Sequence, residues 1–327
     1  MMLLRRAVLR LLAGAAALPA AARIAPAQGY PARPVRVIVP FAAGGTSDIF
    51  GRLVAQKLGE RLGGTFYVEN VGGASGNIGT AQAARAAADG QTIFIAFTSF
   101  VVNPTMFDKV PYDPSKDFEP VTLAVSSTHV ITVNPSVPAK SLGELVALIR
   151  TGSAKYSFAS PGVGTPAHLL GEMLRLSQRL DLVHVPFTGG AGPSIAAVVA
   201  GHVPIGFSTL ASAAQQIAAG QLGALAVTGK ARSSLRPELP TTAEAGYPDI
   251  AGDAWVGVLV PAGTRKEIVA LLNREIVAIV SLPEMKERLA TLGFEPVGST
   301  PEEFAGRIRS ELDSWGRVIR AANIKAE

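Results

Sequence analysis

Two glycine-rich segments of the chain have the composition of an anion-binding site. The first covers residues 40–48 and the second residues 70–79, and each joins an apolar run to a helical pattern. Backbone N–H groups at the start of a helix lack helical partners, and the helix dipole favours negative charge there. Such a site binds a carboxylate or phosphate, and two of them side by side suit a ligand with two acidic groups, or one acid held from two directions. The candidate donors are Ala43, Gly44, Gly45, Thr46, Ser47, Ala74, Ser75, Gly76 and Asn77.

Hydroxyl groups and glycines also follow later apolar runs, and they offer hydrogen bonds rather than charge. These further candidates are Thr98, Ser99, Ser160, Gly162, Val163, Gly164, Thr165, Thr188, Gly189 and Ser208. An acid would repel an anion, so we interpret Asp48 as a helix cap. A simpler interpretation, in which the glycines only make tight turns, stays open for either segment alone.

Residues that catalyse reactions are sparse in these segments. The chain has no cysteine, and its four histidines, His129, His168, His184 and His202, lack metal-ligand spacing. Neither a Walker A motif nor the dinucleotide pattern G-x-G-x-x-G occurs, so we expect no metal and no cofactor. The competing hypothesis is a secreted hydrolase or transferase that pairs Ser75 or Ser160 with His184. Such an enzyme needs a third group that orients the histidine.

Alternating strand and helix patterns predict the elements that position these segments. Strands are predicted at residues 35–39, 65–68 and 92–97, with helices at 49–62 and 77–88 between them. This order implies right-handed crossovers and a mostly parallel sheet. A proline-punctuated connection follows. Residues 121–133 then read as two strand-like runs with Ser126, Ser127 and Thr128 between them.

A second alternating series starts at a helix over residues 141–150, where Ser141 and Glu144 form a capping box. Later strands are predicted at residues 156–159, 182–186, 203–207, 222–227 and 255–260, with helices starting near Thr165, Gly192 and Ala211. In the tail, Thr264 and Thr300 are predicted to cap helices. Ligands of open α/β sheets bind outside the carboxyl ends of strands, which is where the glycine segments fall.

Length and composition indicate a globular protein of about two domains. The chain has 327 residues, 48% of them apolar and 17% charged, a composition that excludes disorder and a disulfide scaffold. Of the net charge of +5, Arg5, Arg6, Arg10 and Arg23 contribute +4 within residues 1–27, which leaves +1 for the remainder. The positive net charge therefore does not indicate nucleic-acid binding.

The first 27 residues are typical of an export signal. A basic start is followed by an alanine- and leucine-rich run and by Ala25-Pro26-Ala27, a small-x-small cleavage pattern. Arg5 and Arg6, followed by Val8 and Leu9, resemble a twin-arginine signal. We expect export to the periplasm and a mature chain that begins at Gln28.

Several short motifs, in order along residues 30–325, resemble the Bug or TctC family, the extracytoplasmic solute receptors of tripartite tricarboxylate transporters. The matching motifs are residues 30–35, the segment 40–48, Val68-Glu69-Asn70, Gly76-Asn77-Ile78-Gly79, Tyr112-Asp113-Pro114, His184-Val185-Pro186-Phe187, Leu225-Ala226-Val227-Thr228 and residues 321–325.

The resemblance implies an α/β, type II-like periplasmic binding protein with two lobes. Each lobe would be a mostly parallel sheet flanked by helices, with the ligand cleft between them. Residues 28–129 and 251–327 would form the first lobe and residues 130–250 the second. The glycine segments would hold a small organic carboxylate, the lobes would close on it, and a membrane permease would receive it. We expect a monomer; a receptor for a two-component sensor is the other role that would use the same site.

Some positions depart from the family pattern. Thr188 stands where many relatives have lysine, and Ser208 where many have aspartate. Residues 100–102 are Phe-Val-Val, which is less polar than usual. Together these changes suggest a less charged cleft and favour a monocarboxylate or an aromatic acid over citrate.

Overall fold

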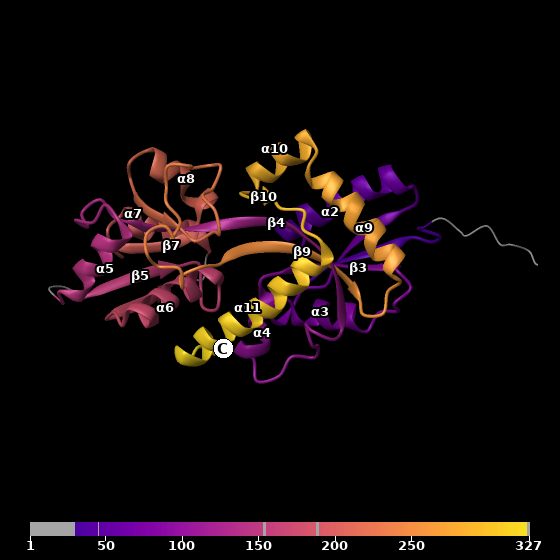
Figure 1. The fold of residues 1–327 in the computed structure, drawn as a ribbon, viewed down its shortest axis with the longest axis horizontal. Coiled ribbons are helices and arrows are strands. Elements are labelled where there is room, and N and C mark those ends of the chain that lie inside the picture. Colours follow the sequence, from indigo (N-terminus) through magenta and orange to yellow (C-terminus); the bar gives the residue numbers. More distant parts are fainter. Residues whose placement is uncertain (1–29, 45, 153–154, 188–189, 326–327) are drawn as a thin grey trace, which may run out of the picture.

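The computed structural model describes residues 30–44, 46–152, 155–187 and 190–325. The predicted signal peptide, its cleavage site, Gly45, Thr188 and Gly189 lie outside these residues. The described chain forms two α/β lobes that follow one another along the long axis of the molecule (Figure 1). The predicted two-lobe α/β architecture is thereby confirmed. None of the described helices is both long and apolar enough to cross a membrane.

Lobe 1 contains three parallel strands from the N-terminal part of the chain, in the order β2-β1-β3. They are β1 (Val35–Val39), β2 (Phe66–Asn70) and β3 (Thr92–Phe97). In the central strand β1 every residue except Arg36 is buried, as a strand covered on both faces requires. The crossover helices α2 (Thr46–Leu62) and α3 (Asn77–Ala84) each follow a glycine segment. Helix α3 ends at Ala84, whereas the sequence predicted a helix up to residue 88.

Two long antiparallel strands connect the lobes. They are β4 (Phe118–Val133) and β9 (Asp253–Pro261). β4 pairs with β9 up to Thr128 and, from His129 onward, with strands of lobe 2. The prediction of two separate runs here is wrong. The chain stays extended through Ser126 and Ser127 because both residues pair with β9.

Lobe 2 repeats the arrangement of lobe 1, with three parallel strands in the order β7-β5-β6. Its strands are β5 (Tyr156–Ser160), β6 (Leu182–Pro186), β7 (Ile205–Thr209) and β8 (Gly223–Val227). Its helices are α5 (Leu142–Arg150), α6 (Pro166–Gln178), α7 (Ala191–Val199) and α8 (Leu210–Ala218). β4 lies antiparallel to β7 and β8. Each lobe thus has a parallel set of strands extended by antiparallel neighbours.

The C-terminal helices return to lobe 1. They are α9 (Lys266–Val280), α10 (Pro283–Thr291) and α11 (Pro301–Ala321), with the short strand β10 (Glu295–Pro296) before the last. Thr300 and Glu303 form the predicted capping box of α11. Thr264 does not cap α9 as predicted. Its hydroxyl donates instead to the carbonyl of Pro261, at 2.7 Å.

A helix that the sequence did not predict follows β3. α4 (Ser99–Met106) lies where prolines indicated an irregular connection, and it contains Pro104. Proline has no N–H to donate to the carbonyl of Phe100, four residues earlier. The hydroxyl of Tyr112 lies 3.4 Å from that carbonyl and 3.2 Å from the side-chain oxygen of Asn77. The helix continues past the proline to Met106.

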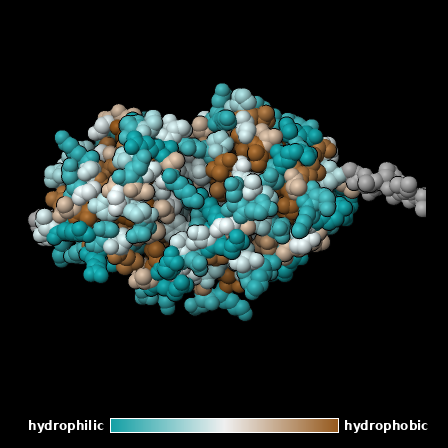
Figure 2. Space-filling model, in the orientation of Figure 1, coloured by the Kyte–Doolittle hydropathy of each residue, from teal (hydrophilic) through white to brown (hydrophobic). Residues whose placement is uncertain are grey.

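Buried apolar side chains form three clusters around the sheet. One spans both lobes and includes Phe94, Phe158 and Trp255, another packs β1 against α2 and α9, and a third lies around α7 and α8 in lobe 2. On the face drawn in Figure 2, hydrophobic residues occur as separate patches over both lobes. The shared cluster indicates that the lobes pack together and are not joined by the two strands alone.

Candidate functional site

The structure brings the two glycine segments into contact. The side-chain amide of Asn70 donates to the carbonyl of Phe41 at 3.0 Å. Gly72 lies beside Ala42, where an added Cβ would stand 3.6 Å from its backbone nitrogen. At Gly79 an added Cβ would stand 2.9 Å from the Cα of Pro40 in the first segment. The close approach of the two loops therefore requires glycine at position 79.

Asp48 stabilises the first segment from within. Its carboxylate accepts from the backbone N–H of Gly44 at 2.8 Å and from Arg52 and Asn70 at 3.1 and 2.9 Å. Burial alone would raise its pKa, but the hydrogen bonds from Arg52, Gly44 and Asn70 hold the pKa of Asp48 below its usual value. The N–H of Gly44, predicted as a ligand donor, is therefore used inside the loop. The side chain of Ser47 is buried beside it.

The second segment has an unusual backbone. Gly73, Ala74, Ser75 and Gly76 all have positive φ, from 46° to 120°. For Ala74 and Ser75 this conformation costs roughly 1–2 kcal/mol per residue. The amide of Asn103 on α4 donates to the carbonyl of Ser75 at 2.9 Å and to the side-chain oxygen of Asn77 at 2.8 Å. Asn103 thus holds the strained turn, and the amide oxygen of Asn77 faces α4.

Replacing Asn103 by leucine is expected to loosen this turn. Two acceptors lose their donor, which costs about 1–3 kcal/mol of the free energy of unfolding. Hydrogen exchange should then accelerate at the amides of residues 74–77. Asn273→Leu is the matched control, because the Asn273 amide also donates to two carbonyls, at 2.9 and 2.8 Å, but away from this turn. Equal exchange in both variants would contradict the assignment.

In lobe 2 a serine and two histidines form a compact group. The hydroxyl of Ser160 lies 2.7 Å from Nε2 of His184. The rings of His184 and His168 stack at 3.7 Å between centroids, and Nδ1 of His168 accepts from the N–H of Gly164 at 3.0 Å. Burial lowers the pKa of His168 to about 3 and that of His184 to about 4. Both rings are therefore neutral at pH 7.

This group meets part of the requirement for an enzyme. The serine lies within hydrogen-bond reach of the histidine, but in the described part of the chain no carboxylate hydrogen-bonds His184. Glu172 lies 4.0 Å from the other ring, His168, and pairs with Arg175 at 2.6 Å. Ser160 has no exposed surface. The histidine is oriented by ring stacking, and the serine is enclosed.

Acid should destabilise the fold through these histidines. Their folded pKa values lie below the value of about 6.5 expected for the unfolded chain, so the unfolded state binds more protons between pH 6.5 and 4. The free energy of unfolding is therefore highest above pH 6.5 and decreases toward pH 4. The slope is about 1.4 kcal/mol per pH unit for each additional proton that the unfolded state binds. Urea unfolding at several pH values should show this slope. His168→Gln should reduce it, whereas a change at the exposed His202 should not.

Other predicted hydroxyl groups are turned inward. Thr98 is fully buried and its hydroxyl accepts from the N–H of Trp255 at 3.1 Å. Ser208 is 2% exposed, and its hydroxyl oxygen has no hydrogen-bond partner. Thr165 caps α6 by accepting from His168 and donates to Gly162. Among the predicted polar side chains, Ser75 is exposed and Ser99 is half-buried.

Helix α4 links the two halves of the candidate cleft. Its Asn103 contacts the second glycine segment, and its last residue, Met106, lies against Gly164 of lobe 2. A Cβ added at Gly164 would stand 2.3 Å from the terminal carbon of Met106. The loops of residues 74–77 and 160–165 therefore both contact α4, at Asn103 and at Met106.

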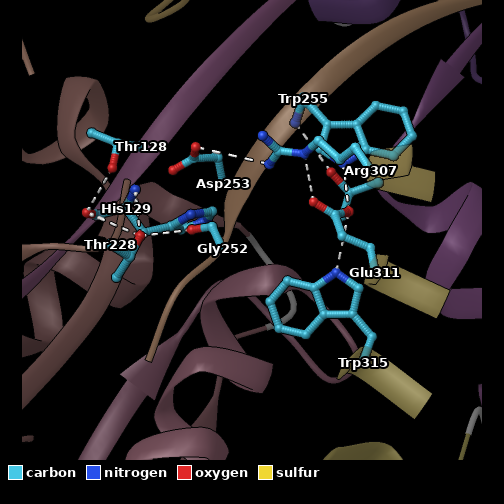
Figure 3. A network of polar contacts seen from close by, with 10 residues as sticks. Thr128, His129, Thr228, Gly252, Asp253, Trp255, Arg307, Glu311 and Trp315 are labelled. Carbon is cyan, nitrogen blue, oxygen red and sulfur yellow. Dashed lines mark hydrogen bonds and ion pairs between the residues drawn. The ribbon is translucent and has the colours of Figure 1, made fainter. Parts of the chain in front are cut away.

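A polar network that sequence analysis missed lies where β4 and β9 pass between the lobes (Figure 3). The hydroxyl of Thr228 donates to the carbonyl of Gly252 at 2.7 Å. Nearby, Glu311 accepts from the indole N–H of Trp255 at 2.7 Å and from Arg307 at 2.7 Å. A cavity of about 920 Å³ opens beside it. No predicted ligand-binding residue lines that cavity.

Comparison with known proteins places this geometry in a family. The model of the tripartite tricarboxylate transporter family receptor, TctC, matches residues 50–324. BugT of Bordetella pertussis is 34% identical over 301 residues, which cover 91% of this chain and 92% of BugT. In the described ranges, no group of three or more histidines and acids could hold a metal ion.

Solved structures are similar over the same length. Rpa4515 of R. palustris with adipate is 31% identical, covers 90% of this chain and 99% of its own, and gives a TM-score of 0.72. A TctC solute-binding protein from Polaromonas without ligand is 26% identical, covers 89% of this chain and 99% of its own, and gives a TM-score of 0.82. The overall shape is thus more similar to the ligand-free protein, although the sequence is less similar.

Proposed function

The chain belongs to the tripartite tricarboxylate transporter receptor family, and we propose that it captures a small organic carboxylate between its lobes and delivers it to a membrane permease. The observation that carries this proposal is the contact between the two glycine segments at the starts of α2 and α3. Helix starts supply N–H donors and a favourable dipole for an anion. The adipate in Rpa4515 supports a carboxylate as the ligand class.

The proposed cycle includes closure of the lobes. We propose lobe 1 as residues 28–129 with 251–327 and lobe 2 as residues 130–250. The change of partner along β4, from β9 at Thr128 to β7 at His129, supports these boundaries. Closure would exclude water and strengthen the hydrogen bonds to the ligand.

Export belongs to the same proposal. Residues 1–27 would direct the chain to the periplasm by the twin-arginine route, and the mature protein would begin at Gln28 and act as a monomer. The basic start, the apolar run and the small-x-small pattern support this assignment. The periplasmic binding proteins of the family support it further.

A thermal-shift screen tests the proposal. Residues 28–327 would be unfolded and refolded to remove bound molecules, then mixed with mono-, di- and tricarboxylates, aromatic acids, the corresponding amides, and sugars. A ligand of the native state adds about 2.7 kcal/mol of stability at a hundredfold excess over its dissociation constant. At least one acid, but not its amide, should raise the melting temperature. A flat response to every acid would contradict the proposal.

The Ser160–His184 contact is the one observation that favours a second candidate function, hydrolysis or acyl transfer. Against that alternative, we propose that the chain is not an enzyme, because Ser160 has no exposed surface that a substrate could reach. Treatment with a fluorophosphonate and with p-nitrophenyl esters should leave the protein unlabelled and the esters intact. Labelling that disappears in Ser160→Ala would reverse this assignment.

A further inference from the structure

The side chains that the cleft loops expose are mostly apolar. In lobe 1 the loops expose Ala43, Ala74 and Ile78, and in lobe 2 they expose Val163. Ile78 and Val163 are 53% and 45% exposed, which is high for large apolar residues. The predicted polar side chains that are buried instead are Ser47, Asn77, Thr98, Ser160 and Ser208. A molecule between these loops would contact backbone amides, hydrocarbon and the exposed hydroxyl of Ser75.

The two exposed apolar residues belong to loops of different lobes that both contact α4. Ile78 lies in the first turn of α3, and its side chain covers Gly73, where an added Cβ would stand 2.7 Å from the terminal carbon of Ile78. Val163 lies next to Gly164, which packs against Met106 at the end of α4. The contact of α4 with both loops brings one loop from each lobe to the same helix.

Positive charge is missing from these loops. Residues 40–48, 70–79, 98–103, 160–168, 187–192 and 208–212 contain neither lysine nor arginine. The neighbouring Arg52 is engaged by Asp48 and Asn70, at 3.0 and 3.1 Å. His168 and His184 stack as a neutral pair, which their lowered pKa values support. A second carboxylate in the closed cleft would lose water without gaining a cation.

We infer that the ligand is a monocarboxylate with an apolar body. This inference rests on the proposed function and narrows its substrate class. The carboxylate binds the amides of the two glycine segments in lobe 1. The hydrocarbon lies between Ile78 and Val163, where closure removes both side chains from water. A dicarboxylate of the same length is disfavoured because its far end meets no cation.

Calorimetric titration at pH 7.5 with hexanoate, adipate, benzoate and hexanamide tests this inference on refolded residues 28–327. Hexanoate and adipate have the same number of carbons and differ in the second carboxylate. Hexanoate or benzoate should bind at least tenfold more tightly than adipate, and hexanamide should not bind. Adipate that binds as tightly as the monocarboxylates, or more tightly, would overturn the inference and leave the proposed function intact. Binding of none of the three acids, while another acid raises the melting temperature in the thermal-shift screen, would overturn the inference alone; a flat response to every acid as well would overturn both.

A positive charge introduced at Val163 gives a second test. Val163→Lys should raise adipate affinity at least tenfold and lower hexanoate affinity, because it supplies the missing cation. Val183→Lys is the matched control, since Val183 is a 56% exposed valine of the same lobe but lies within β6. If Val163→Lys does not fold, as judged by circular dichroism, Ile78→Lys tests the same point from lobe 1. Unchanged relative affinities in the folded variant would contradict the inference.

Discussion

Replacing Gly76 by valine is expected to lower carboxylate affinity about 100-fold or more. Gly76 has φ +92°, and an added Cβ would stand 3.3 Å from the ring of Phe41 in the first glycine segment. The turn must move, and the N–H groups at the start of α3 move with it. Losing two charge-assisted hydrogen bonds at about 1.5–3 kcal/mol each corresponds to a change of this size. Titration with the acid that gives the largest thermal shift measures it.

Gly63→Val provides the matched control for this prediction. Gly63 also has positive φ, at +71°, but an added Cβ would meet no atom within 4 Å. It follows α2, at the opposite end of that helix from the first glycine segment. Both variants should be less stable because valine is strained at positive φ. Only Gly76→Val should lose affinity, so equal affinities in the two folded variants would count against the glycine segments as the binding site.

Replacing Glu311 by leucine is expected to lower the free energy of unfolding by about 3–5 kcal/mol. Glu311 is 8% exposed on α11 and accepts from the indole of Trp255 and from Arg307, both at 2.7 Å. The indole of Trp315 lies 3.4 Å from the same carboxylate. Leucine leaves two buried N–H groups without an acceptor and leaves Arg307 with only Asp253, 3.8 Å away, as an acidic partner. Urea unfolding at pH 7.5 measures the loss.

Glu275→Leu is the matched control for Glu311. Glu275 is 7% exposed on α9 and also binds two arginines, Arg61 at 2.8 Å and Arg274 at 2.9 Å. The side chains of these arginines are 38% and 69% exposed, so water can solvate them when the acid is removed. The loss should be smaller here. A loss as large as that of Glu311→Leu would show that the buried indoles do not set the cost.

Local patterns predicted the glycine segments because the residues that favour a turn or the start of a helix lie next to one another in the sequence. The capping box of Thr300 and Glu303 was predicted for the same reason, and the structure contains it. The hydrogen bond from Gly44 to Asp48 could not be predicted with the same certainty. It depends on how the loop folds back over four residues, and it removes a donor that composition alone counts as available.

The errors arose where tertiary contacts override local preference. Pro104 indicated an irregular connection, yet α4 forms with Phe100 and Val101 buried in the cluster that both lobes share. Ser126 and Ser127 were predicted to separate two strands, yet β4 continues because β9 pairs with them. In each case the deciding partner lies far along the chain, or in another strand, and periodicity does not report it.

Long-range contacts between side chains could be named from the sequence only as alternatives, or not at all. Ser160 and His184 lie 24 residues apart and meet because β5 and β6 are parallel neighbours in register. Glu311 meets Trp255 across 56 residues because α11 returns to the junction of the lobes. Sequence analysis named the first pair only as a possibility, and it had no signal for the second.

The central claim is that the lobes close on a carboxylate, and small-angle X-ray scattering tests it most directly. Refolded residues 28–327 would be measured alone, with the acid that gives the largest thermal shift, and with the amide of that acid. If the lobes close on the carboxylate, the radius of gyration should be smaller with the acid and unchanged with the amide. An acid that binds without any change in the radius of gyration would contradict closure of the lobes.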